Sequence, residues 1–192
     1  MEVNYVKGEK EEFENIIKDI ISNETVQKMK NFRQHCNISC YEHCYRTAFY
    51  CYKICKKFNW DYKAVARASM LHDLFLYDWR VKSNRKGLHA FTHPKAAYDN
   101  ASRIFKLSKK EKDIIVKHMW PLTITPPKYK ESYILTLMDK FSATKESFEY
   151  TVECVKKNQT LKYTYVFLAF ILMNFYRKGK FVLATLLKMI WL

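Results

Sequence analysis

The chain has 192 residues, of which 48% are hydrophobic, and its formal net charge is +15. This length favours a single domain with one sizeable core, and three glycines and four prolines are too few for a sheet-rich fold with many turns, so we expect an all-α protein. The positive charge favours an anionic ligand, such as a phosphate ester, a nucleic acid or an acidic membrane.

Apolar periodicity and end signals predict helices in the first part of the chain. We expect one helix or two short helices over 9–30 and one long helix over 34–58. Asp61 is a suitable N-cap for the next helix, over 62–76. The basic segment DWRVKSNRKG, residues 78–87, contains a glycine and predicts a loop.

Prolines and a capping box mark the helices of the second part. Pro94 suits the first turn of a helix that runs to about Phe105. The segment SKKE, residues 108–111, has the form of a capping box, and Pro121 ends the helix that it opens. Another helix is expected over 130–146, with further helices after it.

The C-terminal segment is strongly apolar. Its stretch YTYVFLAFILMNFY, residues 163–176, is shorter than the roughly 20 residues that span a bilayer. We expect residues 147–192 to form hydrophobic helices that pack on the core, or a homodimer interface, with peripheral binding to an acidic membrane as the alternative. The first 20 residues carry acids where a signal peptide has an apolar core, which predicts a cytoplasmic protein.

Five of the six cysteines share one face of the predicted long helix. They are Cys36, Cys40, Cys44, Cys51 and Cys55. Small thiols on a buried stripe are the preferred interpretation. A metal or iron–sulfur site is disfavoured because the segment lacks CxxC and its thiols lie along one helix, and redox chemistry is the other alternative.

Histidines and acids within the predicted helices are the main chemical signal. All six histidines fall between His35 and His118, although any one of them alone would more often be a hydrogen-bonded core or surface residue. The candidates for a shared site are His43, His72, Asp73, His93, His118 and Asp139. A buried carboxylate is costly unless it is paired or binds a metal. Imidazole and carboxylate together suit divalent transition metals.

The order and the local contexts of these residues resemble the HD domain superfamily of metal-dependent phosphohydrolases, in its H…HD…H…H…D form. The segments that carry the resemblance are EHCYRTA, ASMLHDLF, THPKAA and LMDKFSA, within residues 35–145. The resemblance implies a helical bundle, with an N-terminal helical segment over 1–33 and the metal-binding core over 34–146.

Departures from the family pattern bear on the substrate. THPKAA is similar to the His-Pro-x-x-Gly segment of the cyclic dinucleotide phosphodiesterases, with Ala97 in place of glycine. The segment LFLYDW lacks the glycine and lysine common in the cyclic nucleotide branches, and no GYP segment follows His118. The layout is similar to small stand-alone bacterial HD proteins, including those that split dinucleoside tetraphosphates.

The resemblance implies one or two divalent ions of Fe, Mn, Ni, Co or Zn. One metal would be held by His43, His72, Asp73 and Asp139, and Asp73 would bridge to a second metal held by His93 and His118. Consecutive helical side chains diverge by about 100°, so His72 can hold one metal while Asp73 reaches both. His93 is preferred to His89 because its spacing to Ala97 matches the family pattern. A metal-activated water would attack the phosphate.

The expected catalytic residues are Asp73, Lys140 and Arg46, the two cations by contacting phosphate. A solvated or ion-paired structural role is the alternative for both cations. The substrate-binding candidates are His89, Arg80, Arg85 and Lys86. The last three belong to the basic loop 78–87, which is either an electrostatic lid over an anionic substrate or a plain solvated loop.

Three functions fit this pattern. The preferred one is a phosphohydrolase that acts on a small phosphate ester or anhydride of the nucleotide or dinucleoside polyphosphate class, with no stable nucleic-acid partner. The first alternative is a di-iron oxygenase of the HD type, which uses the same histidine and carboxylate ligands. The second is a non-catalytic protein that binds metal or nucleotide.

Overall fold

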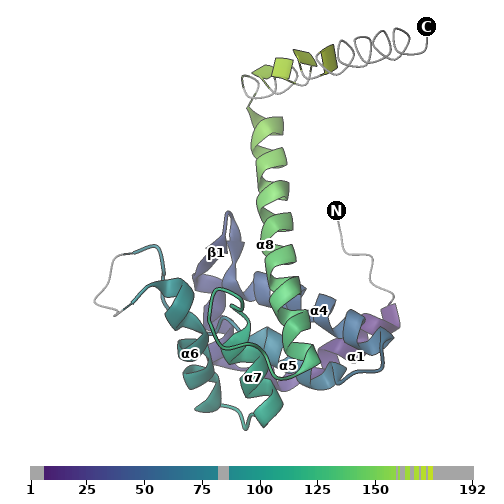
Figure 1. Ribbon diagram of the computed structural model, residues 1–192, viewed down its shortest axis with the longest axis vertical. Coiled ribbons are helices and arrows are strands. Elements are labelled where there is room, and N and C mark those ends of the chain that lie inside the picture. Colours follow the sequence, from purple (N-terminus) through teal and green to yellow (C-terminus); the bar gives the residue numbers. More distant parts are fainter. Residues whose placement is uncertain are drawn as a thin grey trace, which may run out of the picture. The chain divides into compact units, whose positions relative to one another are not determined.

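A computed structural model of the chain shows a helical protein with one small hairpin, β1–β2 (Figure 1). It describes residues 7–81, 87–158, 160, 163, 164, 167, 168, 170, 171, 173 and 174. Contacts divide the chain into two compact units, Met1–Ser147 and Phe148–Leu192, which are described separately. The all-α prediction is confirmed, while the predicted domain limits stay predictions.

The N-terminal region consists of four short helices rather than the one or two predicted over 9–30. They are α1 (Lys7–Ile16), α2 (Lys18–Ile21), α3 (Glu24–Gln27) and the 3-10 helix η1 (Lys28–Asn31). The break before α3 has a local cause. The Asn23 side chain accepts hydrogen bonds from the backbone N–H groups of Thr25 and Val26, so it caps a new helix instead of continuing the previous one.

The prediction of a helix from residue 34 is wrong for its first six residues. These residues belong to an antiparallel hairpin of β1 (Arg33–His35) and β2 (Ile38–Ser39), and α4 spans Cys40–Lys57. Ser39 and Glu42 form a capping box that fixes the helix start at Cys40.

The cysteine stripe is therefore shorter than predicted. Cys40, Cys44, Cys51 and Cys55 are buried free thiols on α4. Cys36 is half-buried in the hairpin turn, where its φ of 50° lies in the left-handed region.

The helix predicted over 62–76 is α5 and ends earlier, so that it spans Tyr62–Leu71. Asp61 caps its start as predicted, by accepting from the Ala64 N–H. After Leu71 the chain turns: the Leu74 N–H donates to the Leu71 carbonyl and the Phe75 N–H to the Asp73 carbonyl. Two side chains hold this turn. Cys40 Sγ donates to the Asp73 carbonyl, and Asn100 Nδ2 donates to the Leu74 carbonyl.

Two further helices lie in the first unit, and a third, α8, begins there and continues past its last residue, Ser147. They are α6 (His89–Ser102), α7 (Lys109–Lys117) and α8 (Lys130–Lys157). The capping box of Ser108 and Glu111 is confirmed. Pro94 lies inside α6 rather than in its first turn, because the Leu88 carbonyl already accepts from Thr92 N–H and starts the helix at His89. This helix also ends before the predicted Phe105.

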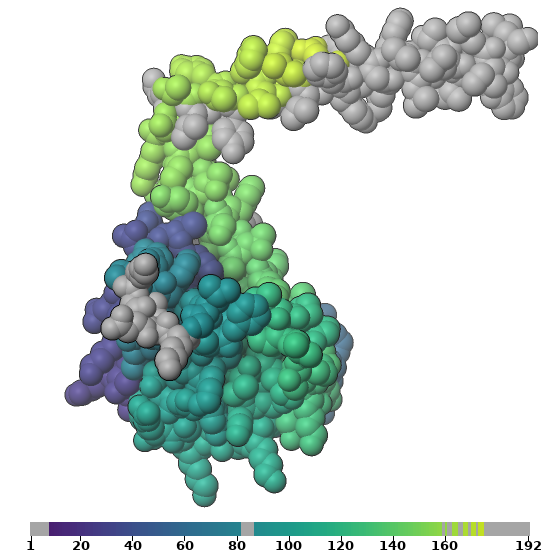
Figure 2. Space-filling model, turned by 60° about the vertical axis from the view of Figure 1, so that its left-hand side comes forward, coloured from purple at the N-terminus to yellow at the C-terminus, as the bar shows by residue number. Residues whose placement is uncertain are grey.

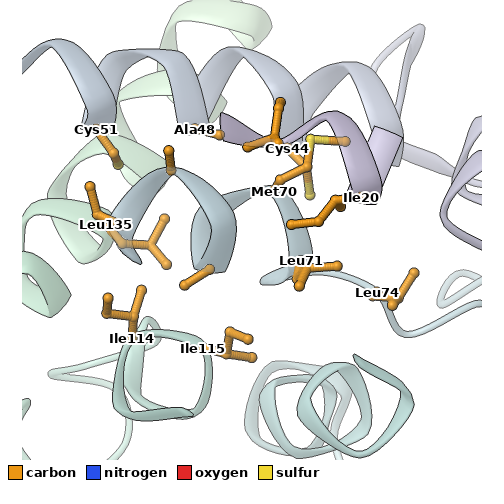
Figure 3. Close-up of a cluster of buried hydrophobic side chains, with 14 of the residues drawn as sticks. Ile20, Cys44, Ala48, Cys51, Met70, Leu71, Leu74, Ile114, Ile115 and Leu135 are labelled. Atoms are coloured by element: carbon orange, nitrogen blue, oxygen red, sulfur yellow. The ribbon is translucent and has the colours of Figure 1, made fainter. Parts of the chain in front are cut away.

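The core of the first unit lies where α5 packs between α4 and α7 (Figure 3). It is formed by fully buried residues from separate elements, including Ile20, Cys44, Ala48, Cys51, Met70, Leu71, Ile114, Ile115 and Leu135. In Figure 2 the teal residues of α6 and α7 cover one face of this unit. The helices therefore bring the ends of α5 and α7 close to α4 and α8.

Part of the predicted C-terminal region, 175–192, lies outside the described residues. Of the second unit, the structure shows the apolar side chains of Phe148, Tyr163, Phe167, Phe170 and Met173 exposed. Among the residues described, none of the helices is long and apolar enough to cross a membrane. Packing of this segment on the core, in a dimer or at a membrane surface stays a prediction.

Candidate metal centre

Six predicted ligand residues from five parts of the chain come together in the first unit. They are His43 on α4, His72 and Asp73 at the end of α5, His93 on α6, His118 at the end of α7 and Asp139 on α8. The first five are buried, and the Asp139 side chain is 13% exposed. The cluster is therefore closed except beside Asp139.

The sequence predicted His72 and Asp73 inside a helix and His93 at a helix start. The structure places all three elsewhere. His72 is the C-cap of α5, Asp73 follows it in the turn, and His93 is one turn inside α6.

Asp73 lies at the centre of the cluster. Its Oδ1 is 3.3 Å from His93 Nε2 and 3.7 Å from His118 Nε2, while its Oδ2 is 3.4 Å from His72 Nε2. The two carboxylate oxygens thus face different histidines. A carboxylate in this position can bridge two ions.

Asp139 joins the other side of the cluster. Its Oδ1 is 3.0 Å from His43 Nε2 and 3.6 Å from His72 Nε2. Among the described residues, four overlapping sets have ligand atoms within 4.8 Å of one another and could each hold an ion: His43, His72 and Asp73; His72, His118 and Asp139; Asp73, His93 and His118; and Cys40, Cys44 and Asp73.

Three imidazoles are oriented by backbone carbonyls. His72 Nδ1 is 2.7 Å from the Ser69 carbonyl, and the Nδ1 atoms of His93 and His118 are each 2.8 Å from the carbonyls of His89 and Ile115. A carbonyl can only accept, so each Nδ1 carries the proton, and in the neutral ring Nε2 keeps a lone pair directed at the cluster. This is the usual arrangement of metal-binding histidines.

Two observations show that the cluster fits a cation. His93 Nε2 and His118 Nε2 are 2.8 Å apart, and each Nδ1 donates to a carbonyl, so the two Nε2 atoms need a shared proton or a metal cation between them. In the described part of the chain, His72 Nε2 and Asp73 Oδ1 are buried without a hydrogen-bond partner. Such unsatisfied groups cost about 1–3 kcal/mol each, and a divalent metal would satisfy them.

Protonation in the metal-free chain differs among the histidines. Burial, together with the charges of His72 and His93, lowers the pKa of His118 to about 3, so this ring is neutral. Burial alone would lower the pKa of His43, but its hydrogen bonds to Asp139 and Glu146 outweigh burial and raise this pKa well above its usual value. A proton therefore competes with a metal at His43.

The acids show the opposite balance. Burial alone would raise the pKa of Asp73, but the charges of His72 and of the nearby His93 outweigh it and lower this pKa. The pKa of Asp139 is also lowered, because the hydrogen bond from His43 and the nearby charge of His72 outweigh its burial. Both acids are therefore ionised and ready to bind a cation.

Sequence reasoning missed two polar partners of the cluster. Glu146 Oε2 is 2.9 Å from His43 Nδ1, and Gln34 Nε2 is 2.5 Å from Asp73 Oδ2. Glu146 follows Asp139 by two helical turns, so a shared helix face could have indicated it. Gln34 gave no such signal, because residues 34–58 were predicted to form one helix, and nothing in that helix indicated a contact with Asp73.

The predicted catalytic cations lie at different places. Lys140 Nζ donates to the carbonyls of His118, at 3.3 Å, and Thr136, at 3.2 Å, so it lies beside the cluster. Arg46 is partly exposed on α4, one turn after His43. A contact of either residue with phosphate stays a prediction.

The predicted substrate-binding residues are brought together only in part. His89 stacks between His93 and Trp79, with ring centroids 4.5 Å and 5.4 Å away, so it lies beside the cluster. Arg80 is exposed and paired with Asp78 at 2.8 Å. Arg85 and Lys86 lie outside the described residues.

Two core thiols touch the cluster from behind. Cys40 Sγ donates to the Asp73 carbonyl at 3.1 Å, and Cys44 Sγ is 3.5 Å from His72 Nδ1. Burial raises the pKa of both thiols, which keeps them protonated. In the metal-free chain Cys40 is therefore a weak hydrogen-bond donor, while the Cys44 sulfur can only accept from the Nδ1–H of His72.

Comparison with known families matches residues 40–144 to the family described as HD domain. The match covers more than half of the chain and includes all six clustered residues. No curated protein and no solved structure matches the chain. Gln34 and Glu146 lie outside the matched residues.

Proposed function

The chain belongs to the HD domain family, and from this premise we propose that it is a phosphohydrolase. The family indicates a metal-dependent, hydrolase-type activity in general. Our proposal is that the chain cleaves a small phosphate ester or anhydride, of the nucleotide or dinucleoside polyphosphate class. The reacting nucleophile would be water rather than a side chain.

The placement of Asp73 carries this proposal. Its two oxygens face separate histidines, at 3.4 Å for His72 and 3.3 Å for His93. His43, His72, Asp73 and Asp139 would hold one metal, and Asp73, His93 and His118 a second. When bound, two such ions lower the pKa of water and neutralise charge on the phosphoryl oxygens.

The chain's own residues would position and hold these groups. The carbonyl groups behind His72, His93 and His118 fix the ring orientations, and Glu146 holds His43 from behind. Partly exposed Asp139 marks where a substrate can approach, and Lys140 beside it supplies a positive charge for phosphate. The net charge of +15 would attract an anionic substrate.

Metal analysis combined with phosphate release tests the proposal. Protein purified without chelators would be assayed for Fe, Mn, Ni, Co and Zn, and then for phosphate release from nucleotides, dinucleoside polyphosphates and simple monoesters. We expect Asp73→Asn to reduce release by more than about 100-fold, because even residues behind the ligands contribute 10–100-fold. The control is Asp99→Asn, which changes an acid that pairs with Lys95 on the surface of α6.

Full activity of Asp73→Asn, or no metal in the wild-type protein, would contradict the proposal. Turnover that requires oxygen and releases no phosphate would instead support the oxygenase alternative.

A further inference from the structure

The hairpin β1–β2 lies before the residues that match the HD domain family, yet it reaches the centre of the cluster. In β1, Arg33 is exposed and Gln34 is buried, with 8% of its surface exposed. Gln34 Nε2 donates to Asp73 Oδ2 at 2.5 Å. Because a carboxylate with a lowered pKa only accepts, the amide nitrogen must be the atom that faces it.

The hairpin is held firmly against the start of α4. Arg33 pairs with Ser39 in the sheet, and Cys40 N–H donates to the Phe32 carbonyl at 2.8 Å. Cys40 Sγ in turn donates to the carbonyl of Asp73. Two side chains of one continuous segment thus bind Asp73: Cys40 binds its main-chain carbonyl and Gln34 binds its carboxylate.

Gln34 is not placed for stability alone. In the described part of the chain, its Oε1 is buried without a hydrogen-bond partner. A buried acceptor left unpaired costs about 1–3 kcal/mol, so the amide is unfavourable on its Oε1 side. The useful contribution of the amide is its bond to Asp73.

We propose that Gln34 is a positioning residue that sets the rotation of the Asp73 carboxylate. The bond to Gln34 holds Oδ2 on the side of His72 and leaves Oδ1 directed at His93 and His118. The last torsion of an aspartate is otherwise broad. Without the amide, the carboxylate can turn and present both oxygens to one ion, which weakens the bridge to the other. The inference rests on the metal-binding part of the proposed function.

The test is Gln34→Met, which keeps an unbranched side chain of similar length and removes the donor. Wild-type and variant chains, stripped of metal, would be titrated with Co²⁺ and followed by calorimetry and by visible absorption. We expect two binding events in the wild type. In the variant one event weakens by about 10–100-fold, with a changed Co²⁺ spectrum.

Two further variants separate positioning from folding. Arg33→Gln changes the exposed neighbour in the same strand and should leave both binding events unchanged. Gln34→Asn keeps an amide but is shorter by one methylene, so it should show the same defect as Gln34→Met. Thermal unfolding of the metal-free proteins checks that each variant still folds. If Gln34→Met does not fold, the metal affinities of Gln34→Asn decide the question.

Two binding events of wild-type affinity in both Gln34 variants would overturn the inference. A single Co²⁺ per wild-type chain would overturn it as well. These outcomes are distinct from failure of the proposed function, because a wild-type chain that binds two ions but releases no phosphate leaves the comparison of affinities intact.

Discussion

The buried pair of Glu146 and His43 allows a sharp test of how the cluster is built. Glu146 is 2% exposed, and its Oε2 lies 2.9 Å from His43 Nδ1. The substitution Glu146→Gln keeps the size of the side chain and a carbonyl that can accept from Nδ1–H. It removes only the negative charge behind the ring, which makes His43 a more basic ligand.

The expected magnitude follows from this geometry. Loss of a carboxylate behind a metal-binding histidine costs about 10–100-fold in metal affinity. This corresponds to roughly 1.4–2.7 kcal/mol. We expect the weakened event to be the one that involves His43 and Asp139, since the 3.0 Å contact joins these two residues.

The same change has a consequence for pH in the metal-free chain. The pKa of His43 is raised in the folded state, so the stability that its protonated form provides is fully present below the unfolded pKa of about 6.5. That stability is lost as the pH rises through the higher folded pKa. Glu146→Gln removes one of two carboxylate partners and so lowers the folded pKa, which means that the loss should be smaller and should be complete at a lower pH.

Metal titration at pH 8 and thermal unfolding of metal-free protein from pH 5 to pH 9 measure both effects. Glu153→Gln is the matched control, because Glu153 is an exposed acid on the same helix that pairs with Lys157. Unchanged metal affinity in Glu146→Gln, together with an unchanged pH profile, would show that the carboxylate does not act through His43.

Three other predictions concern stability. Asp113→Asn should destabilise the fold by about 1–3 kcal/mol, because Asp113 accepts from the Lys128 N–H just before α8 and from the Ser132 hydroxyl in its first turn. The pKa of Asp113 is lowered, since these bonds and Lys117 outweigh its burial. The difference in unfolding free energy between wild type and variant, measured with denaturant, should therefore shrink as the pH falls through the folded pKa. A difference that stays constant with pH would contradict this. Chelation with EDTA should lower the melting temperature by roughly 5–10 °C if the metal is present at 100 times its Kd, and no shift would count against a bound metal. Cys51→Ser should cost about 1–3 kcal/mol by burying a hydroxyl, whereas Cys36→Ser should cost less than about 0.5 kcal/mol; equal losses in thermal unfolding would contradict the burial of the stripe.

Local signals in the sequence predicted most of the helices. The caps at Asp61 and Ser108 depend on side chains within three residues, and both are confirmed. The hairpin before Cys40 was missed because five residues are too short to show a strand period. The turn after α5 was missed because the side chains that hold it, Cys40 and Asn100, are distant in sequence.

In the candidate site, too, features with local sequence signals were predicted and contacts between distant segments were not. The six clustered residues were predicted because each has a characteristic local context, and the structure brings them together. Their partners were not predicted. Gln34 reaches Asp73 only through the hairpin, and Glu146 reaches His43 across 103 residues of sequence. The Gln34 contact depends on tertiary packing that no local pattern encodes, whereas the position of Glu146 two helical turns after Asp139 could have indicated that both share one face of α8.

The central claim is that Asp73 bridges two divalent metals. A crystal structure of the protein prepared with Mn²⁺, with the ions located by anomalous scattering, tests it most directly. The account predicts two ions, one beside His43, His72 and Asp139 and one beside His93 and His118, each bound to a different oxygen of Asp73. A single ion, or two ions that do not share Asp73, would contradict it.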